Sequence, residues 1–205
     1  MALVSSTIIE DIDAMRKSGL ASLAFFYFDF REDQKRDRHG LLSSVLVQLC
    51  HQSDSYCDVL SKLYLEHASG SRYPSDDTLL GCLKDLLNLQ GQAPIYLIVD
   101  ALDECPNASD RPTPREKVLE LIEKLVNSRL PNLRICVTSR PEFDIATFLD
   151  TLTFRTVSLH DEIGQMADIE NYIKSVIVAD PKNRRWSAKD KQVVIDVLTK
   201  NANGM

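Results

Sequence analysis

Three carboxylates stand together near the middle of the chain, directly after an apolar segment at residues 95–99: Asp100, Asp103 and Glu104. Five apolar residues without alternation, rich in β-branched side chains, are typical of a strand buried on both faces. Acids that follow such a strand lie at its carboxyl end, where open α/β sheets bind ligands. One acid there could hold a hydrated Mg²⁺ and a second could orient an attacking water, which is phosphoryl-transfer chemistry.

A hydroxyl pair and an arginine follow a second apolar segment. Residues 133–137 are strand-like, and Thr138, Ser139 and Arg140 come directly after them. Because the carboxyl ends of parallel strands meet at one edge of a sheet, we expect the hydroxyl pair and Arg140 at the same edge as Asp100.

Each of these clusters also has a plainer interpretation. The acids could simply form a helix-capping turn after a buried strand. Arg140, which precedes a proline at a strand end, could be a surface residue that pairs with Glu142 or Asp144. The residues themselves leave both alternatives open.

The rest of the chain predicts the elements that position these side chains. Four apolar segments are expected to be strands: residues 20–28, 95–99, 133–137 and 154–159. Amphipathic stretches of helical period separate or flank them, over residues 1–17, 41–49, 59–64, 76–87, 114–126, 166–176 and beyond Ser187. Thr113, Pro114 and Glu116 form a well-defined helix start. Strands separated by such helices indicate an α/β fold, a parallel sheet with helices on both faces.

Composition limits the kinds of partner. The chain has 205 residues, enough for one sizeable core, and a net charge of −6. That acidic balance argues against a nucleic-acid surface, and the apolar stretches are too short to cross a membrane. The five cysteines are scattered and form no zinc-type spacing with the histidines, so we expect reduced thiols and a cytoplasmic location.

Taken together, the motifs resemble the NACHT domains of the STAND class of P-loop NTPases. The resemblance is strongest to the nephrocystin-like NACHT modules abundant in fungal ankyrin- and WD-repeat proteins. It rests on five segments, at residues 98–105, 137–142, 26–30, 168–173 and 203–205. It implies a three-layer, P-loop NTPase-like parallel sheet and a Walker B role for residues 98–104.

The resemblance also assigns a role to each candidate site residue. Asp100 would contact Mg²⁺, usually through water, and either Asp103 or Glu104 would polarise the attacking water. Arg140 resembles the sensor-1 arginine that reads the γ-phosphate. The intact parent would therefore use Mg²⁺ with ATP or GTP.

One part of the family pattern is not found in these 205 residues. No GxxxxGK[ST] loop, whose amides and lysine cradle the phosphates, occurs in the sequence. The resemblance implies a strand order 2-3-4-1-5, and we expect a chain truncated before or at the Walker A motif, with the central first strand missing. The expected domains are a core at residues 1–178 and the start of a helical region at residues 179–205.

Three functions are compatible with this pattern. The first is a fragment of a nucleotide-binding signalling switch that self-associates and carries ankyrin or WD repeats in its parent. The second is a degenerate protein-interaction module without nucleotide binding, and the third is a nonfunctional fragment. Without the phosphate loop we expect this chain alone to hold no nucleotide tightly, and whether it is an enzyme stays open.

Overall fold

The computed structural model describes residues 2–67, 73–107, 111–152, 155–157, 163–180, 183 and 185–201. The chain divides into two compact units, Met1–Leu152 and Thr153–Met205, and each is described by itself. The expected domain boundary after residue 178 falls near the end of a helix of the second unit, α7 (Ile163–Ala179).

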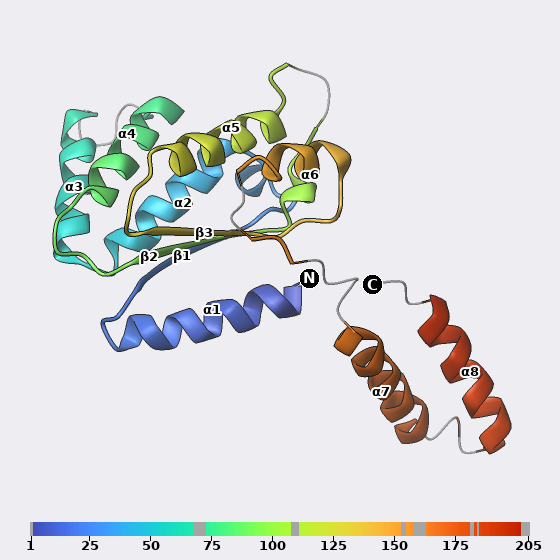
Figure 1. The fold of residues 1–205 in the computed structure, drawn as a ribbon. Helices are drawn as coiled ribbons and strands as arrows, with labels where there is room; N and C mark the ends of the chain where they lie inside the picture. Colours follow the sequence, from blue (N-terminus) through green and yellow to red (C-terminus); the bar gives the residue numbers. More distant parts are fainter. Residues whose placement is uncertain are drawn as a thin grey trace. The chain divides into compact units, whose positions relative to one another are not determined.

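The first unit is built on a sheet of three parallel strands in the order β1-β2-β3 (Figure 1). The strands are β1 (Ser22–Tyr27), β2 (Ile95–Asp100) and β3 (Leu133–Val137), as expected from the three mainly apolar segments. A fourth strand was predicted at residues 154–159. The described part of that segment, residues 155–157, is not in a strand, and the remainder lies outside the described residues.

Helices cover both faces of this sheet. Helix α1 (Ala2–Lys17) packs on one face through Ile12, which joins a small cluster with Leu23 and Ile98. The larger core occupies the other face, beneath the remaining helices of the unit (Figure 1). These helices are α2 (Arg38–Cys50), α3 (Asp54–Glu66), α4 (Asp76–Leu87), α5 (Pro114–Asn127) and α6 (Phe143–Leu149). Two 3₁₀ turns, η1 (Asp33–Lys35) and η2 (Leu102–Glu104), complete the unit.

The helix boundaries follow the local capping chemistry. Ser75 accepts the backbone N–H of Thr78 at 3.2 Å and begins α4. Thr113 and Glu116 form the predicted capping box: the Thr113 hydroxyl accepts the Glu116 N–H at 3.1 Å, and the Glu116 carboxylate accepts the Thr113 N–H at 2.7 Å. Gly19, at φ +73°, occupies the left-handed conformation that ends α1.

Two glutamine side chains close the outer edge of β1. Gln48 of α2 accepts the N–H of Phe25 at 3.0 Å and donates to its carbonyl at 2.7 Å. Gln52, one helical turn further along, does the same for Leu23 at 2.9 and 2.5 Å. A side-chain amide has the same donor and acceptor as a peptide group, so the two glutamines take the place of a neighbouring strand.

The second unit is a pair of packed helices, α7 and α8 (Ala188–Asn201). Ser187 begins α8 as predicted, because its hydroxyl accepts the N–H of Asp190 at 3.2 Å. The side chains of Ile177 and Ile195 are buried, whereas Val193 and Val197 are about half exposed. Within the described residues, no helix is both long enough and apolar enough to cross a membrane.

Candidate functional site

Asp100 is the last residue of the central strand and therefore lies at the carboxyl edge of the sheet. Its side chain is 4% exposed, and its Oδ1 accepts hydrogen bonds from the hydroxyls of Ser5 and Thr138. Ser5 comes from the first turns of α1, and Thr138 directly follows β3. The carboxylate is therefore held from both sides: by Thr138, one of the hydroxyl pair that the sequence places at this edge, and by Ser5, which the sequence did not identify.

The charge of Asp100 acts on neighbouring groups. Burial raises the pKa of Tyr27, and the charge of Asp100 raises it further, although a hydrogen bond with Ser6 opposes both effects. Burial likewise raises the pKa of Cys136, with a second contribution from Asp100. The electrostatic potential at this edge of the sheet is therefore negative, which favours binding of a cation.

A hydrated Mg²⁺ fits this donor set better than a metal held entirely by the protein. Magnesium usually keeps several waters and takes only one or two carboxylates together with substrate phosphates. Oδ2 of Asp100 accepts no hydrogen bond from the described residues, so it is available to such an ion. The described part of the chain contains no group of three or more histidine, cysteine or acidic side chains arranged for a metal.

The turn that follows β2 is fixed to the end of β3. Ala101 adopts the left-handed conformation at φ 54° and ψ 47°, which is uncommon for a residue with a Cβ and is concentrated at functional turns. Its N–H donates to the hydroxyl of Thr138 at 3.2 Å, and the N–H of Leu102 donates to the carbonyl of Thr138 at 3.0 Å. Leu102 is fully buried and anchors the turn in the core.

Asp103 and Arg140 are direct partners. Oδ1 of Asp103 accepts the backbone N–H of Arg140 at 3.0 Å, and Nε of Arg140 lies 3.4 Å from Oδ2. The Asp103 side chain is 7% exposed and the Arg140 side chain 73% exposed. The alternative prediction, a pairing of Arg140 with Glu142 or Asp144, is therefore wrong. Both of those acids lie beside Arg115 instead.

Glu104 differs from Asp103 in having an unengaged carboxylate. No hydrogen bond or ion pair to this carboxylate is present among the residues that the structure describes. Its charge reaches Arg31, whose pKa is raised mainly by a hydrogen bond to Asp29 and to a smaller extent by Glu104. Of the two acids between which the sequence could not choose, Glu104 is the one whose oxygens are free to accept from a water.

Arg115 is a site-supporting residue that was not predicted. Its side chain is almost fully buried, and it donates from Nη2 to the carbonyl of Asp103 at 2.6 Å and from Nε to the carbonyl of Cys105 at 3.0 Å. Nη1 donates to Asp144 of α6 at 3.1 Å. A signal was present in the sequence, because Arg115 occupies the first position of the apolar stripe that continues at Val118.

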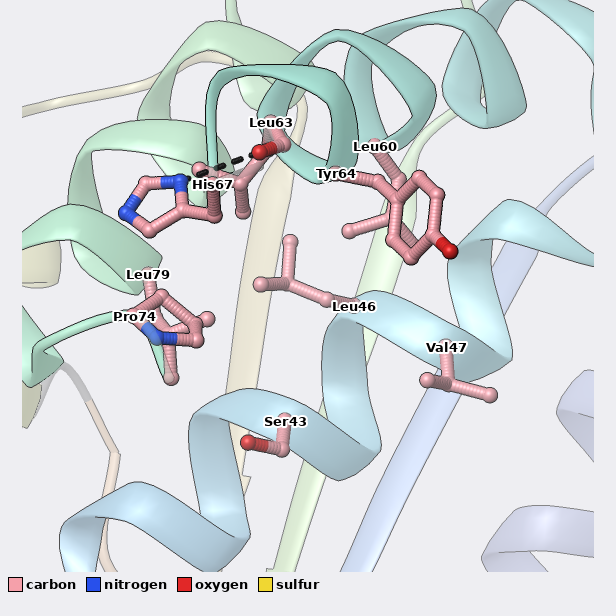
Figure 2. Close-up of a pocket in the computed structure, with 9 residues that line it drawn as sticks. All are labelled: Ser43, Leu46, Val47, Leu60, Leu63, Tyr64, His67, Pro74 and Leu79. Atoms are coloured by element: carbon pink, nitrogen blue, oxygen red, sulfur yellow. Dashed lines mark hydrogen bonds between the residues drawn. The ribbon is translucent and has the colours of Figure 1, made fainter. Parts of the chain in front are cut away.

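One cavity lies away from the acids. It has a volume of about 270 Å³ and is enclosed by α2, α3 and the start of α4 (Figure 2). Its walls are mostly apolar, with Leu46 and Leu79 among them, and the ring of His67 is tied back to the carbonyl of Leu63 at 3.0 Å. Neither the acids that follow β2 nor Arg140 lines this cavity.

Comparison with known proteins identifies the family. The family model described as "Nephrocystin 3, N-terminal" matches residues 2–140, a span that contains all three strands and the candidate site from Ser5 to Arg140. No curated protein and no solved structure gives a match. Because the family model covers more than half of the sequence, the chain belongs to the nephrocystin 3 N-terminal family.

Proposed function

We propose that the unit Met1–Leu152 belongs to a cytoplasmic, NACHT-type signalling switch with a P-loop NTPase-like fold. In that switch it would supply the residues that contact the metal and the attacking water of a nucleotide site. The observation that carries the proposal is the position of Asp100. It ends the central strand, it is held by hydroxyls from α1 and from the residue after β3, and its Oδ2 accepts no hydrogen bond from the residues that the structure describes. Ligands of open α/β sheets bind at this edge.

Asp100, Glu104 and Arg140 would each have a separate role at this site. A bound Mg²⁺ would supply charge neutralisation for the phosphates, and Asp100 would hold it through water. Glu104 would accept a hydrogen bond from the attacking water, because its carboxylate is unengaged. Arg140 would contact the terminal phosphate, since its guanidinium is exposed and tied only loosely to Asp103.

These 205 residues would hold the nucleotide only weakly. They contain no GxxxxGK[ST] loop, so the triphosphate would face Asp100, Asp103 and Glu104 with little counter-charge beyond Arg140 and the metal. We expect a dissociation constant of about 1 mM or weaker for Mg-ATP, which corresponds to about 4 kcal/mol or less.

The second candidate is an interaction module that binds no nucleotide. It is favoured by the lack of a phosphate loop in this sequence. In either case, self-association and appended ankyrin or WD repeats in the parent remain proposals that rest on the resemblance alone.

Paramagnetic broadening of amide resonances by Mn-ATP separates the two candidates. The nucleotide proposal expects broadening centred on residues 100–104 and 138–140 and its loss in Asp100→Asn, which keeps an oxygen for Ser5 and Thr138 but removes the charge. Asp150→Asn, an exposed acid at the end of α6, serves as the control. Broadening elsewhere, or equal broadening in Asp100→Asn, would refute the nucleotide site. A low-micromolar affinity by calorimetry would refute the expected weak binding.

A further inference from the structure

One guanidinium joins the turn after β2 to helix α6. Arg115 of α5 donates from Nη2 to the carbonyl of Asp103 at 2.6 Å and from Nε to the carbonyl of Cys105 at 3.0 Å. From Nη1 it reaches both carboxylate oxygens of Asp144, Oδ2 at 3.1 Å and Oδ1 at 3.3 Å. Asp144 lies in the first turn of α6, so the same side chain holds the turn and the helix.

Asp144 has a second partner, in the loop before α5. Nδ2 of Asn107 donates to Oδ2 of Asp144 at 3.0 Å, and Oδ1 of Asn107 accepts the hydroxyl of Thr113 at 3.1 Å. The ion pair with Arg115 is partly shielded, because the arginine side chain is 9% exposed and that of Asp144 39%. Partly buried pairs are screened much less by salt than surface pairs.

Arg140 lies in the short connection between β3 and α6. Its N–H donates to Oδ1 of Asp103 at 3.0 Å, and its carbonyl accepts the N–H of Glu142 at 2.8 Å. Glu142 directly precedes α6, and its carbonyl accepts the N–H of Ala146 at 2.9 Å. Arg140 is thus attached to the turn after β2 on one side and to the start of α6 on the other, the two segments that Arg115 joins.

The contacts form a closed circuit through Asp103, Arg115, Asp144 and Arg140. The guanidinium of Arg140 is 73% exposed and its ion pair with Asp103 measures 3.4 Å, so its own side-chain contacts restrain it little. Its reach is set by the backbone that carries it. Asp144 is the member of the circuit that can be changed without removing a partner of Arg140 or a donor to the turn.

We propose that Asp144 is a positioning residue for Arg140. By holding the first turn of α6 to Arg115, it keeps Arg140 in a fixed place relative to the turn that carries Glu104. The inference rests on the proposed function, in which Arg140 contacts the terminal phosphate and Glu104 accepts from the attacking water. Those two roles need a fixed separation, because a displacement of about 1 Å is enough to lose much of a positioned group's effect.

Amide hydrogen exchange, measured by NMR on the whole chain, tests the positioning without a ligand. In Asp144→Ala the Arg140 amide is expected to exchange about tenfold faster than in the wild-type chain, because its segment loses one attachment. The Thr138 amide is the internal reference, since it donates to the carbonyl of Val99 at 2.9 Å and should keep its rate. An unchanged rate at Arg140, or an equal increase at Thr138, would overturn the proposal.

Glu142→Gln is the matched control. This neighbouring acid lies 4.0 Å from Nη1 of Arg115, its side chain is 49% exposed, and its loss should leave the Arg140 amide unchanged. An increase as large as in Asp144→Ala would assign the effect to charge at the start of α6 and overturn the proposal.

Arg115→Lys tests the route of the effect. A single ammonium cannot serve both the turn and Asp144, so this variant should reproduce the faster exchange at Arg140. Asp144→Ala should then add little to it. A full additional increase would mean that Asp144 acts without Arg115, which also overturns the proposal. If circular dichroism shows that Arg115→Lys is unfolded, Asp144→Ala and its control decide alone.

Mg-ATP and Mg-ADP separate this inference from the proposed function. In the wild-type chain the Arg140 amide resonance should shift more with Mg-ATP, which carries the terminal phosphate. Asp144→Ala should lose most of that difference while residues 100–104 still respond. A retained difference would overturn the positioning role and leave the nucleotide site intact. No response at residues 100–104 or Arg140 in the wild-type chain would refute the proposed function, and the exchange rates would still decide whether Asp144 fixes Arg140.

Discussion

Arg140 and Asp103 are joined by two contacts of unequal character. The first is a hydrogen bond from the Arg140 backbone N–H to Oδ1 of a nearly buried carboxylate, at 3.0 Å. The second is an exposed ion pair from Nε to Oδ2, at 3.4 Å. Arg140→Ala keeps the first contact, whereas Asp103→Ala removes both. The two residues should therefore respond very differently to mutation.

Asp103→Ala is expected to lower the free energy of unfolding by about 1–2 kcal/mol, because the Arg140 N–H loses its acceptor. Arg140→Ala is expected to change it by no more than about 0.5 kcal/mol, because exposed ion pairs contribute little. Urea unfolding followed by circular dichroism measures both. An equal loss in the two variants would show that the ion pair, and not the backbone hydrogen bond, is the stabilising contact.

Asp100→Ala is expected to destabilise the first unit by about 1–3 kcal/mol, because the hydroxyls of Ser5 and Thr138 lose their shared acceptor in a buried position. Asp100→Asn keeps an oxygen and is expected to cost less. In a double-mutant cycle, Thr138→Val should cost much less in the Asp100→Ala background than in the wild-type chain. Additive losses would mean that the Asp100–Thr138 hydrogen bond does not stabilise the fold.

Arg115→Met is expected to cost about 2–4 kcal/mol, since two carbonyl groups of the turn after β2 lose a charged donor. Arg134→Met is the matched control, because that arginine is exposed and bonds only the carbonyls of Pro131 and Leu133. Hydrogen exchange adds a local measurement: the amides of residues 102–105 should lose protection in Arg115→Met. Unchanged protection there would contradict the role given to Arg115.

Asp76 should give the first unit an acid-sensitive contribution to stability. Burial alone would raise its pKa, but hydrogen bonds from Arg38 and His39 outweigh burial and lower the pKa from 3.8. Because the folded pKa lies below the unfolded one, the stabilisation is complete above about pH 4 and is lost as the pH falls through the folded pKa. Asp76→Asn should therefore have a flatter decline in urea midpoint below pH 4. Asp77→Asn, with an 85% exposed side chain, is the control and should decline like the wild-type chain.

The elements that could be predicted are those whose signal is local. The three strands are short, mainly apolar runs, and the start of α5 is a complete capping box, so neighbouring residues alone define them. Helix α6 was missed because it has seven residues and buries only Ile145, which is too little for a periodic pattern.

The parts of the site that could not be predicted depend on contacts between distant segments. Ser5 reaches Asp100 across 95 residues. The sequence places Thr138 at the same sheet edge as Asp100, but it does not predict the hydrogen bond between them, which spans 38 residues. Nothing near Ser5 in the sequence distinguishes it from other helical serines. Arg115 did leave a signal, a charged residue in an apolar stripe, but its acceptors at Asp103 and Cys105 become evident only once the turn after β2 is folded.

Gln48 and Gln52 cover the β1 edge of the sheet and so hinder the addition of a strand there. A strand arriving beside β1 would have to break four hydrogen bonds and move the end of α2 aside before it could make any of its own. In the described residues β3 pairs with β2 alone, and no comparable pair of side chains covers its other side. Among the described strands, the free edge is therefore that of β3, and a further strand, from a longer chain or from another molecule, would add there.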